Sequence, residues 1–215
     1  MDDPAVKPTR RYDASGRRAR AGERRQAMVA AARHRFLEDG YAATTVASVA
    51  MEAGVSVESV YKAVRGKAGL VQAVWEDALF GARNVAEPAE QRADAAANSA
   101  TDPRDVIRVW ADLSAEVSPL AWPVLSLVRS AALVHPEAAK LRDEIEAGRA
   151  RRMSQNAGFL ARGGHLRAGV SRSRARDILL AYSVELYDPL VLRAGWSLSA
   201  YSEHLERAMV ATLLA

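Results

Sequence analysis

The sequence predicts an all-α protein, in which a three-helix unit with a helix-turn-helix precedes a larger helical domain. Two short apolar stripes of helical period flank Gly54, and longer stripes of the same period continue through residues 67–215. Apolar residues make up 49% of the 215 residues, so a substantial core can be buried. The predicted division is a basic flexible arm over 1–22, the helix-turn-helix unit over 23–66 and the larger domain over 67–215.

Composition and charge narrow the class of protein. The absence of cysteine excludes disulfides and thiolate metal sites, and it fits a reducing cytoplasm. No apolar run approaches the roughly 18–20 residues that span a bilayer, and the first residues lack the hydrophobic segment of a secretory signal. Residues 1–70 hold 13 Lys and Arg against 8 Asp and Glu, whereas residues 71–215 hold 17 against 18. This imbalance favours a polyanionic partner for the N-terminal third.

The arm, residues 1–22, is basic, contains proline and glycine, and has no apolar period. Such a segment is expected to be disordered in the free protein. Beside a DNA-binding helix it could lie along phosphates or enter a narrow minor groove. The alternative is a solvated charged tail without any DNA contact.

The three helices of the N-terminal unit follow from spacing and end signals. An alanine-rich helix is predicted from Glu23 to Asp39, with Gly40 as the left-handed residue that ends it. Its basic residues are expected on the outside: Arg24, Arg25, Arg33 and Arg35. The second helix is predicted from the stripe Val46, Val49, Ala50 and Ala53, and the third from the N-cap Ser56 and the stripe Val57, Val60 and Val64. This spacing is typical of a helix-turn-helix, whose last helix enters the major groove, but any helical hairpin can share it.

Positions on both sides of this turn share one order and spacing: Met28-Val29, Ala32, Phe36, Gly40-Tyr41, Thr44-Thr45-Val46, Val49-Ala50, Ala53-Gly54-Val55-Ser56, Val60-Tyr61 and Lys67-x-x-Leu70. Over about residues 24–75 this pattern resembles the N-terminal domain of the TetR family of bacterial transcriptional regulators. The resemblance implies a homodimer that binds a palindromic operator in the bacterial cytoplasm and is nucleoid-associated when bound. It also implies a C-terminal helical domain that dimerises and binds an inducer.

The resemblance and side-chain chemistry together give the candidate DNA-binding residues: Thr44, Thr45, Ser56, Val57, Glu58, Ser59, Tyr61, Lys62 and Lys67. In the family, the positions that match Thr45, Tyr61 and Lys67 touch phosphates, which suits a helix-opening hydroxyl, a phenol and an ammonium group. Lys62 supplies a further positive charge that is expected to face a phosphate. The first turn of the third helix reaches base edges, where a valine can touch a thymine methyl and a serine can bond either kind of edge. Glu58 could accept from cytosine, or it could only favour the helix dipole.

The connection to the larger domain departs from the family pattern. Val64 stands where phenylalanine is usual, and Gly66 and Gly69 stand where a polar cap and an acid are common. Two glycines weaken the first turn of the next helix, because glycine loses more conformational entropy than other residues. A softer connection and a less certain phosphate contact by Lys67 are therefore expected.

The larger domain is predicted element by element from its apolar stripes. A helix is expected to reach about Asn84, followed by a loop or frayed helix end over 86–102. The remaining elements are a helix that starts at Pro103 and is interrupted by Pro119 and Pro123, an apolar helix Val124–Val134, a long helix Glu137–Arg162, a loop 165–173, a helix Ala175–Arg193 and a final helix Leu198–Leu214. The last two are expected to form the dimer interface, by analogy with the family.

A small-molecule pocket in this domain has eight candidate lining residues: Trp75, Phe80, Trp110, Trp122, Arg129, Phe159, Tyr182 and Glu185. Aromatic side chains with a few polar groups suit a small apolar or aromatic molecule. The alternative is that these aromatics are core residues. A charge in an apolar helix needs a partner, so Arg129 could equally form a salt bridge.

Catalytic and metal sites are not indicated. The four histidines are scattered without ligand spacing, and the sequence contains no GxSxG, Walker A or GxGxxG motif. We therefore expect no cofactor and no enzymatic activity, although a fused catalytic domain is compatible with the sequence. The predicted function is that of a repressor released from its operator by a small molecule. The alternatives are a DNA-binding dimer without an inducer, whose C-terminal domain only dimerises or binds a protein, and an activator.

Overall fold

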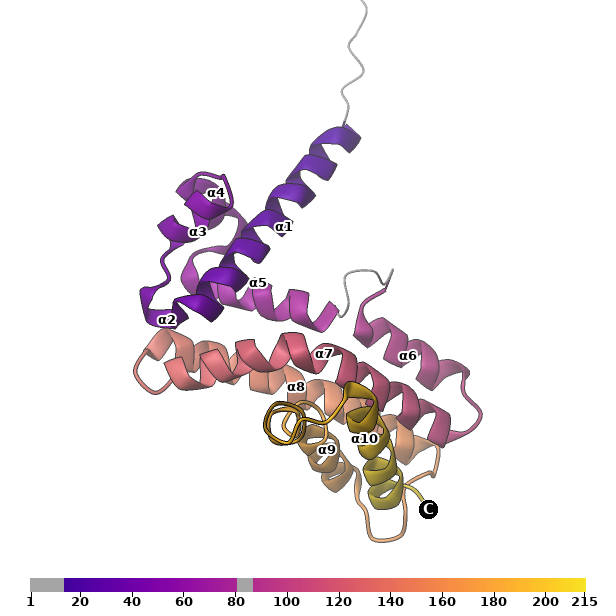
Figure 1. The fold of residues 1–215 in the computed structure, drawn as a ribbon. Coiled ribbons are helices and arrows are strands. Elements are labelled where there is room, and N and C mark those ends of the chain that lie inside the picture. The colour runs from indigo at the N-terminus through magenta and orange to yellow at the C-terminus, as the bar shows by residue number, and fades with distance from the viewer. Residues whose placement is uncertain (1–13, 81–86) are drawn as a thin grey trace, which may run out of the picture.

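The structure, a computed structural model, describes residues 14–80 and 87–215, with side chains from Arg20 onward. Its α-helices are α1 (Ala14–Glu38), α2 (Gly40–Ala43), α3 (Val46–Glu52), α4 (Val57–Val64), α5 (Lys67–Phe80), α6 (Ala89–Ser99), α7 (Pro103–Ala131), α8 (Pro136–Arg162), α9 (Arg172–Ala181) and α10 (Leu198–Leu213). A π-helix, Asp188–Arg193, lies between α9 and α10. The described residues contain no β-strand, only an isolated bridge between Leu166 and Leu214. The predicted all-α class is confirmed (Figure 1).

The predicted helix-turn-helix is present, and α3 and α4 lie beside α1 (Figure 1). Phe36 of α1, Val49 of α3 and Val60 of α4 are each at most 1% exposed and form the centre of this unit. Gly40 and Gly54 have φ angles of 79° and 65°, so the residues that end α1 and α3 use a conformation that favours glycine. Sequence spacing therefore located all three helices of the unit.

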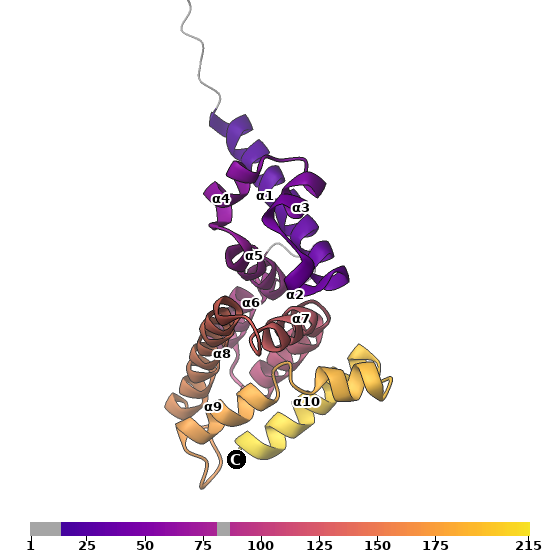
Figure 2. The same cartoon turned by 90° about the vertical axis from the view of Figure 1, so that its left-hand side faces the viewer.

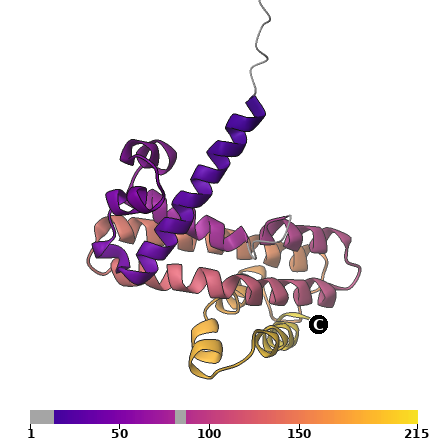
Figure 3. The ribbon, with the colours of Figure 1, turned by 45° about the horizontal axis from the view of Figure 1, so that its top comes forward.

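The first helix begins earlier than predicted. α1 starts at Ala14, so residues 14–22 are helical and not part of a flexible arm. Alanine and arginine are good helix formers, and they outweigh the two glycines in this stretch. Figure 3 shows this end of α1 projecting past α3 and α4. The rest of the predicted arm, residues 1–13, lies outside the described residues.

The N-terminal unit shares a buried apolar cluster with the larger domain. Leu70, Val71 and Val74 of α5 are fully buried and belong to the same cluster as Phe36. This cluster continues into the second half of α7 and the first half of α8, where it includes Leu125. Buried contacts therefore cross residue 66, and the predicted division there stays a prediction.

Three elements of the larger domain differ from prediction. α6 is a separate helix in a stretch expected to be a loop or a frayed helix end, because its alanines are good helix formers and Ala89 and Ala93 are buried next to α7. α7 is one helix through Pro119 and Pro123, since apolar side chains on both sides of the prolines are buried and offset the lost hydrogen bonds. The helix expected over 175–193 ends at Ala181 and resumes only as the π-helix.

Other boundaries in this domain are confirmed. Asp102 caps α7 by accepting from the backbone N–H of Arg104 at 2.8 Å, and Pro103 follows as the first helical residue. α8 and α10 cover nearly the predicted ranges. α7 and α8 run side by side, and α9 and α10 lie on the side away from α1–α4 (Figure 2). Within the described ranges, no helix combines the length and apolarity needed to cross a membrane.

Candidate DNA-binding surface and ligand cavity

Hydroxyl caps fix the start of α3 and the start of α4. Thr45 accepts from the backbone N–H of Ser48 at 3.0 Å, and Ser48 Oγ accepts from the backbone N–H of Thr45 at 3.1 Å. Ser56 accepts from the backbone N–H of Ser59 at 3.2 Å, and the two serine hydroxyls lie 2.9 Å apart. These bonds satisfy free N–H groups at the start of each helix and set the direction of its first turn, and only the Thr45–Ser48 pair is reciprocal.

Most of the predicted DNA-binding side chains share the outer surface of α4. Val57 is 41% exposed and Tyr61 is 54% exposed, whereas Val60 between them is buried. Glu58, Ser59 and Lys62 are also exposed. The structure thus brings together the residues predicted to face bases and two of those predicted to face phosphates.

Thr44 does not belong to this surface. It is 1% exposed, and its hydroxyl donates to the carbonyl oxygens of Gly40 at 2.8 Å and Arg35 at 3.0 Å. The prediction that Thr44 contacts DNA is wrong, because its hydroxyl ties the end of α1 to the turn before α3.

Lys67 is engaged inside the protein. Its ammonium donates to the carbonyl of Ala42 at 3.2 Å and lies 4.4 Å from the ring centroid of Tyr41. Burial lowers the pKa of Lys67, although the nearby Glu137 carboxylate acts in the opposite direction. A phosphate contact by Lys67 would require these interactions to break.

Arg65 was not among the DNA-binding residues predicted from the sequence, but it lies on the same surface at the end of α4. It ends α4 in the left-handed conformation with φ 60°, and its side chain is exposed. Its backbone N–H donates to Tyr61 O at 2.9 Å, which fixes it one turn after that residue. A basic residue three and four positions after Lys62 and Tyr61 was the available signal. In the described part of the chain, neither Lys62 nor Arg65 makes an ion pair.

Gly66, between α4 and α5, and Gly69, in the first turn of α5, make the connection tight, not soft. Gly66 has φ 114°, which side-chain-bearing residues rarely adopt. A Cβ atom on Gly69 would lie 1.6 Å from the carbonyl oxygen of Val64. The expectation of a softer connection is therefore wrong, because the missing side chain lets α5 approach the end of α4 closely.

Two further contacts join the N-terminal unit to the larger domain. Arg33, predicted to face outward, donates to the carbonyls of Leu120 at 3.2 Å and Val74 at 3.3 Å. The Tyr41 hydroxyl donates to Glu137 Oε1 at 3.4 Å. Burial, and then the Glu137 charge, raise the pKa of Tyr41 to about 12. α1 and α2 are thus bonded to α5, α7 and α8.

The larger domain contains a cavity of about 640 Å³ between α5, α6, α7, α8 and α9. Four of the eight predicted ligand-binding residues line it: Trp75, Phe80, Trp110 and Tyr182. Phe159 instead lines a second cavity of about 340 Å³, and Trp110 borders both. Trp122 lines neither and packs against the buried cluster of α7 and α10.

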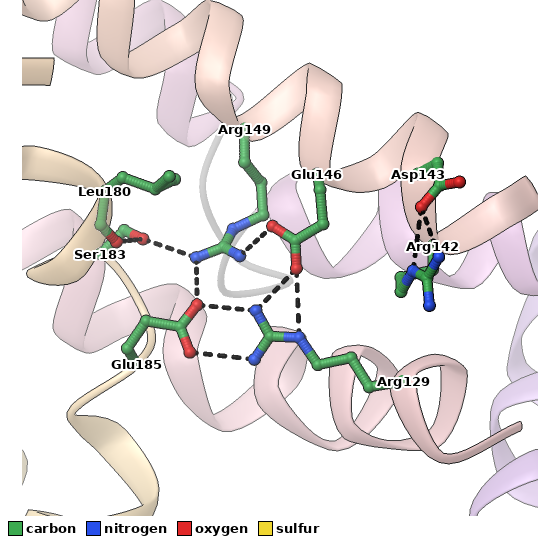
Figure 4. A network of polar contacts seen from close by, with 8 residues as sticks. All are labelled: Arg129, Arg142, Asp143, Glu146, Arg149, Leu180, Ser183 and Glu185. Atoms are coloured by element: carbon green, nitrogen blue, oxygen red, sulfur yellow. Dashed lines mark hydrogen bonds and ion pairs between the residues drawn. The ribbon is translucent and has the colours of Figure 1, made fainter. Parts of the chain in front are cut away.

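The last two predicted ligand residues form an ionic network (Figure 4), defined by Arg129, Glu146, Arg149 and Glu185. Arg129 Nη2 lies 2.6 Å from Glu146 Oε1 and 2.8 Å from Glu185 Oε1. Arg149 binds the same two carboxylates at 2.6 and 2.8 Å. Hydrogen bonding from Arg129 lowers the pKa of Glu185 to about 2, and Glu185 raises the pKa of Arg129. The salt-bridge alternative for Arg129 is correct, and neither group is left unpaired for a ligand.

Comparison with known families agrees with the N-terminal geometry. Residues 28–74 match the model of the bacterial regulatory proteins of the tetR family. Residues 28–74 therefore form the N-terminal domain that this family shares. TetR-family proteins are DNA-binding transcriptional regulators and not enzymes, so the match supports DNA-binding transcriptional regulation as the class of function.

Solved structures share the fold over most of the chain. NalD, the secondary repressor of the MexAB-OprM multidrug efflux pump in Pseudomonas aeruginosa, is 19% identical with a TM-score of 0.69, covering 91% of this chain and 98% of its own. SmeT in its triclosan complex is 16% identical with a TM-score of 0.69, covering 89% and 92%. The fatty acid degradation regulator FadR from Bacillus halodurans is 14% identical with a TM-score of 0.65, covering 87% and 94%. No curated protein matches the chain.

Proposed function

We propose that this protein is a homodimeric repressor of the TetR family that leaves a palindromic operator when a small molecule binds the 640 Å³ cavity. The observation that carries the proposal is the position of α5. Gln72 and Trp75 of α5 line the cavity, whereas Leu70 and Val74 of the same helix are buried in the cluster shared with α1 and α4. A ligand that changes the position of α5 would therefore act on the DNA-binding helices directly.

Release requires a difference in affinity between two states. The ligand must bind the state that fits DNA poorly more tightly than the state that fits it well. The two α4 helices of a dimer have to enter major grooves about 34–36 Å apart, so a small rotation of each N-terminal unit is enough to lose one half-site. The contacts of Arg33 and Tyr41 with the larger domain support such coupling.

At the operator, we assign Val57, Glu58 and Ser59 to base edges, because they occupy the exposed first turn of α4. Thr45, Tyr61 and Lys62 are assigned to phosphates. The hydroxyl of Ser56 already accepts the capping bond from the backbone N–H of Ser59. It therefore holds the first turn of α4 in place and also lies on the surface that faces DNA. The alternative for Glu58 is that its charge only stabilises the positive N-terminal end of the α4 dipole, without a base contact.

Exposed leucines at the C-terminal end support the dimer. Leu192 of the π-helix is 55% exposed and Leu198 of α10 is 42% exposed. Apolar groups left on the surface of one copy are suited to burial against another. A dimer without an inducer is the second candidate, but a cavity of this size favours a ligand, and SmeT, which shares the fold, is described in complex with triclosan.

The test begins with selection of bound DNA from random sequences. The expected site is a palindrome with half-sites one helical turn apart or a multiple of it, and Glu58→Ala should change the preferred base at one position per half-site. A library of small molecules is then screened for release of this DNA, with a reporter gene to separate repression from activation. An asymmetric site would contradict the dimer model. Release by no compound would favour the dimer without an inducer, and ligand-dependent activation would contradict the repressor.

A further inference from the structure

Building on the proposed function, we infer that the cavity takes an uncharged molecule with an aromatic or apolar body. The molecule carries one hydrogen-bond donor for Gln72 and one acceptor for Trp110. Gln72 lines the cavity from α5 and Trp110 lines it from α7. Both helices also contact α1 of the DNA-binding unit.

The acceptor requirement comes from Trp110. This residue is 5% exposed, and its Nε1 atom is buried without any hydrogen-bond partner. Its ring packs edge-on against Phe159, with the centroids 6.1 Å apart. Buried indole N–H groups are normally paired, since an unpaired donor has lost its bond to water without replacement. Trp110 borders both cavities, so a bound molecule is the natural source of the missing acceptor.

The donor requirement comes from Gln72. Its Nε2 donates to Glu76 Oε1 at 3.1 Å, which defines the orientation of the amide. Its Oε1 atom is then an acceptor, and this atom is buried without a partner. A ligand hydroxyl or amide N–H would complete the pair. Both unpaired atoms belong to cavity-lining residues, and they are of opposite kinds.

The ligand is expected to be uncharged because two arginines of the cavity wall are already paired with protein carboxylates. Arg149, with a side chain 7% exposed, is bound to Glu146, Ser183 and Glu185. Arg152 is bound to Glu90 and Asp94. A ligand carboxylate would have to displace a protein carboxylate from one of these arginines. The other charged wall residues in the described ranges, Glu76, Glu144 and Arg151, are exposed.

The body of the ligand is set by the remaining wall. Trp75, Leu113, Val117 and Leu179 are buried apolar residues that line the cavity. Pockets of several hundred Å³ with such walls bind drug-sized apolar molecules and use a few polar groups to orient them. The pair Gln72 and Trp110 would supply this orientation.

Three matched naphthalenes test the inference by isothermal titration calorimetry at neutral pH. 2-Naphthol can donate and accept, 2-methoxynaphthalene can only accept, and 2-naphthoate is an anion. We expect 2-naphthol to bind most tightly and 2-naphthoate at least about tenfold more weakly. Trp110→Phe should weaken both neutral probes by about three- to tenfold, the equivalent of one hydrogen bond. Gln72→Leu should weaken 2-naphthol by a similar factor and leave 2-methoxynaphthalene unchanged.

The matched controls are Trp122→Phe and Gln91→Leu, because neither residue lines the 640 Å³ or the 340 Å³ cavity. They should leave the affinities for all three probes unchanged. Tighter binding of 2-naphthoate, no binding of either neutral probe, or equal effects of Trp110→Phe and Trp122→Phe would overturn the inference. If 2-naphthoate binds best and releases the operator, the ligand class is wrong but ligand-dependent release stands. If 2-naphthol binds as described and the protein stays on its operator, the ligand class stands and release by a ligand in this cavity fails.

Discussion

The outer surface of α4 and the ionic network of Arg129, Glu146, Arg149 and Glu185 use charge in opposite ways. On α4, Lys62 and Arg65 are exposed and make no ion pair within the described chain. In the network, each arginine bridges the same two carboxylates, and Arg149 is buried (Figure 4). The two regions differ in where their charges find partners. The cations on α4 are available to an external polyanion, and the arginines of the network are paired inside the protein.

The same difference separates the roles of the two regions. An exposed cation costs little to keep in water and can bind a phosphate with release of counterions. A buried cation has lost its hydration, so its neighbours must replace it. The network therefore joins α7, α8 and the turn after α9 near the cavity, whereas no side-chain ion pair in the described residues holds Lys62 or Arg65 in place on the α4 surface. Three substitutions test this comparison.

The largest effect is expected from Arg149→Met. The change keeps most of the apolar volume but removes a buried partner of Glu146 and Glu185. We expect the free energy of unfolding to fall by about 3 kcal/mol, because breaking a buried ion pair leaves uncompensated charge. Chemical denaturation measures this value. The control on the same helix, Arg142→Met, removes a pair with the adjacent and exposed Asp143 and should cost under about 1 kcal/mol. Equal effects of the two changes would remove the distinction between network and surface charges.

The next effect is expected where α4 meets α5. Gly69→Ala places a Cβ atom against the carbonyl of Val64, so we expect a loss of about 2 kcal/mol in unfolding free energy and weaker operator binding as α4 shifts. Gly148→Ala is the matched control, because its Cβ would meet only Arg151 at an ordinary 3.7 Å. In a helix interior this control should stabilise the protein by about 0.5–1 kcal/mol. A Gly69→Ala variant as stable as its parent would show that the α4–α5 connection has room to move.

The smallest effect is expected on the α4 surface itself. Lys62→Ala should weaken binding to all DNA sequences by about fivefold and reduce the salt slope by about one, without a change in stability. Tyr61→Phe should have a weaker effect of the same kind, of about threefold. Lys140→Ala, a change at an exposed lysine of α8, is the control and should have no effect. Fluorescence anisotropy over a range of salt concentrations measures these changes. A shift in sequence preference on Lys62→Ala would instead place its ammonium at base edges.

The helix-turn-helix could be predicted because its signals are local. Ser56 as a cap, Gly54 in the turn and the stripe through Val60 all act within a few residues of chain. The burial of Thr44 was not predictable in the same way, since it depends on a carbonyl nine residues away at Arg35. The continuous path of α7 through two prolines was also missed. Packing of distant apolar residues decides that helix, and single-sequence propensity cannot measure it.

The candidate ligand residues were only partly predicted correctly, because which of them line the cavity also depends on distant packing. Aromatic residues at helical spacing gave four cavity residues, but the same signal included Trp122, which is a packing residue. Arg129 was identified as a charge that needs a partner, yet its partners, Glu146 and Glu185, come from other elements of the fold. Gln72 carries no sequence signal at all. Only its position beside a cavity, with a buried oxygen left unpaired, draws attention to it.

The bonds from Arg33 have a practical consequence for building sensors from this protein. Its guanidinium reaches a carbonyl on α5 and another on α7, 41 and 87 residues farther along the chain. A chimera that exchanges the first 66 residues for those of another regulator would also exchange the donor while keeping both acceptors. Grafting a new operator specificity onto this ligand cavity therefore calls for replacing only the outward residues of α4, or for retaining an arginine at position 33 in the grafted domain.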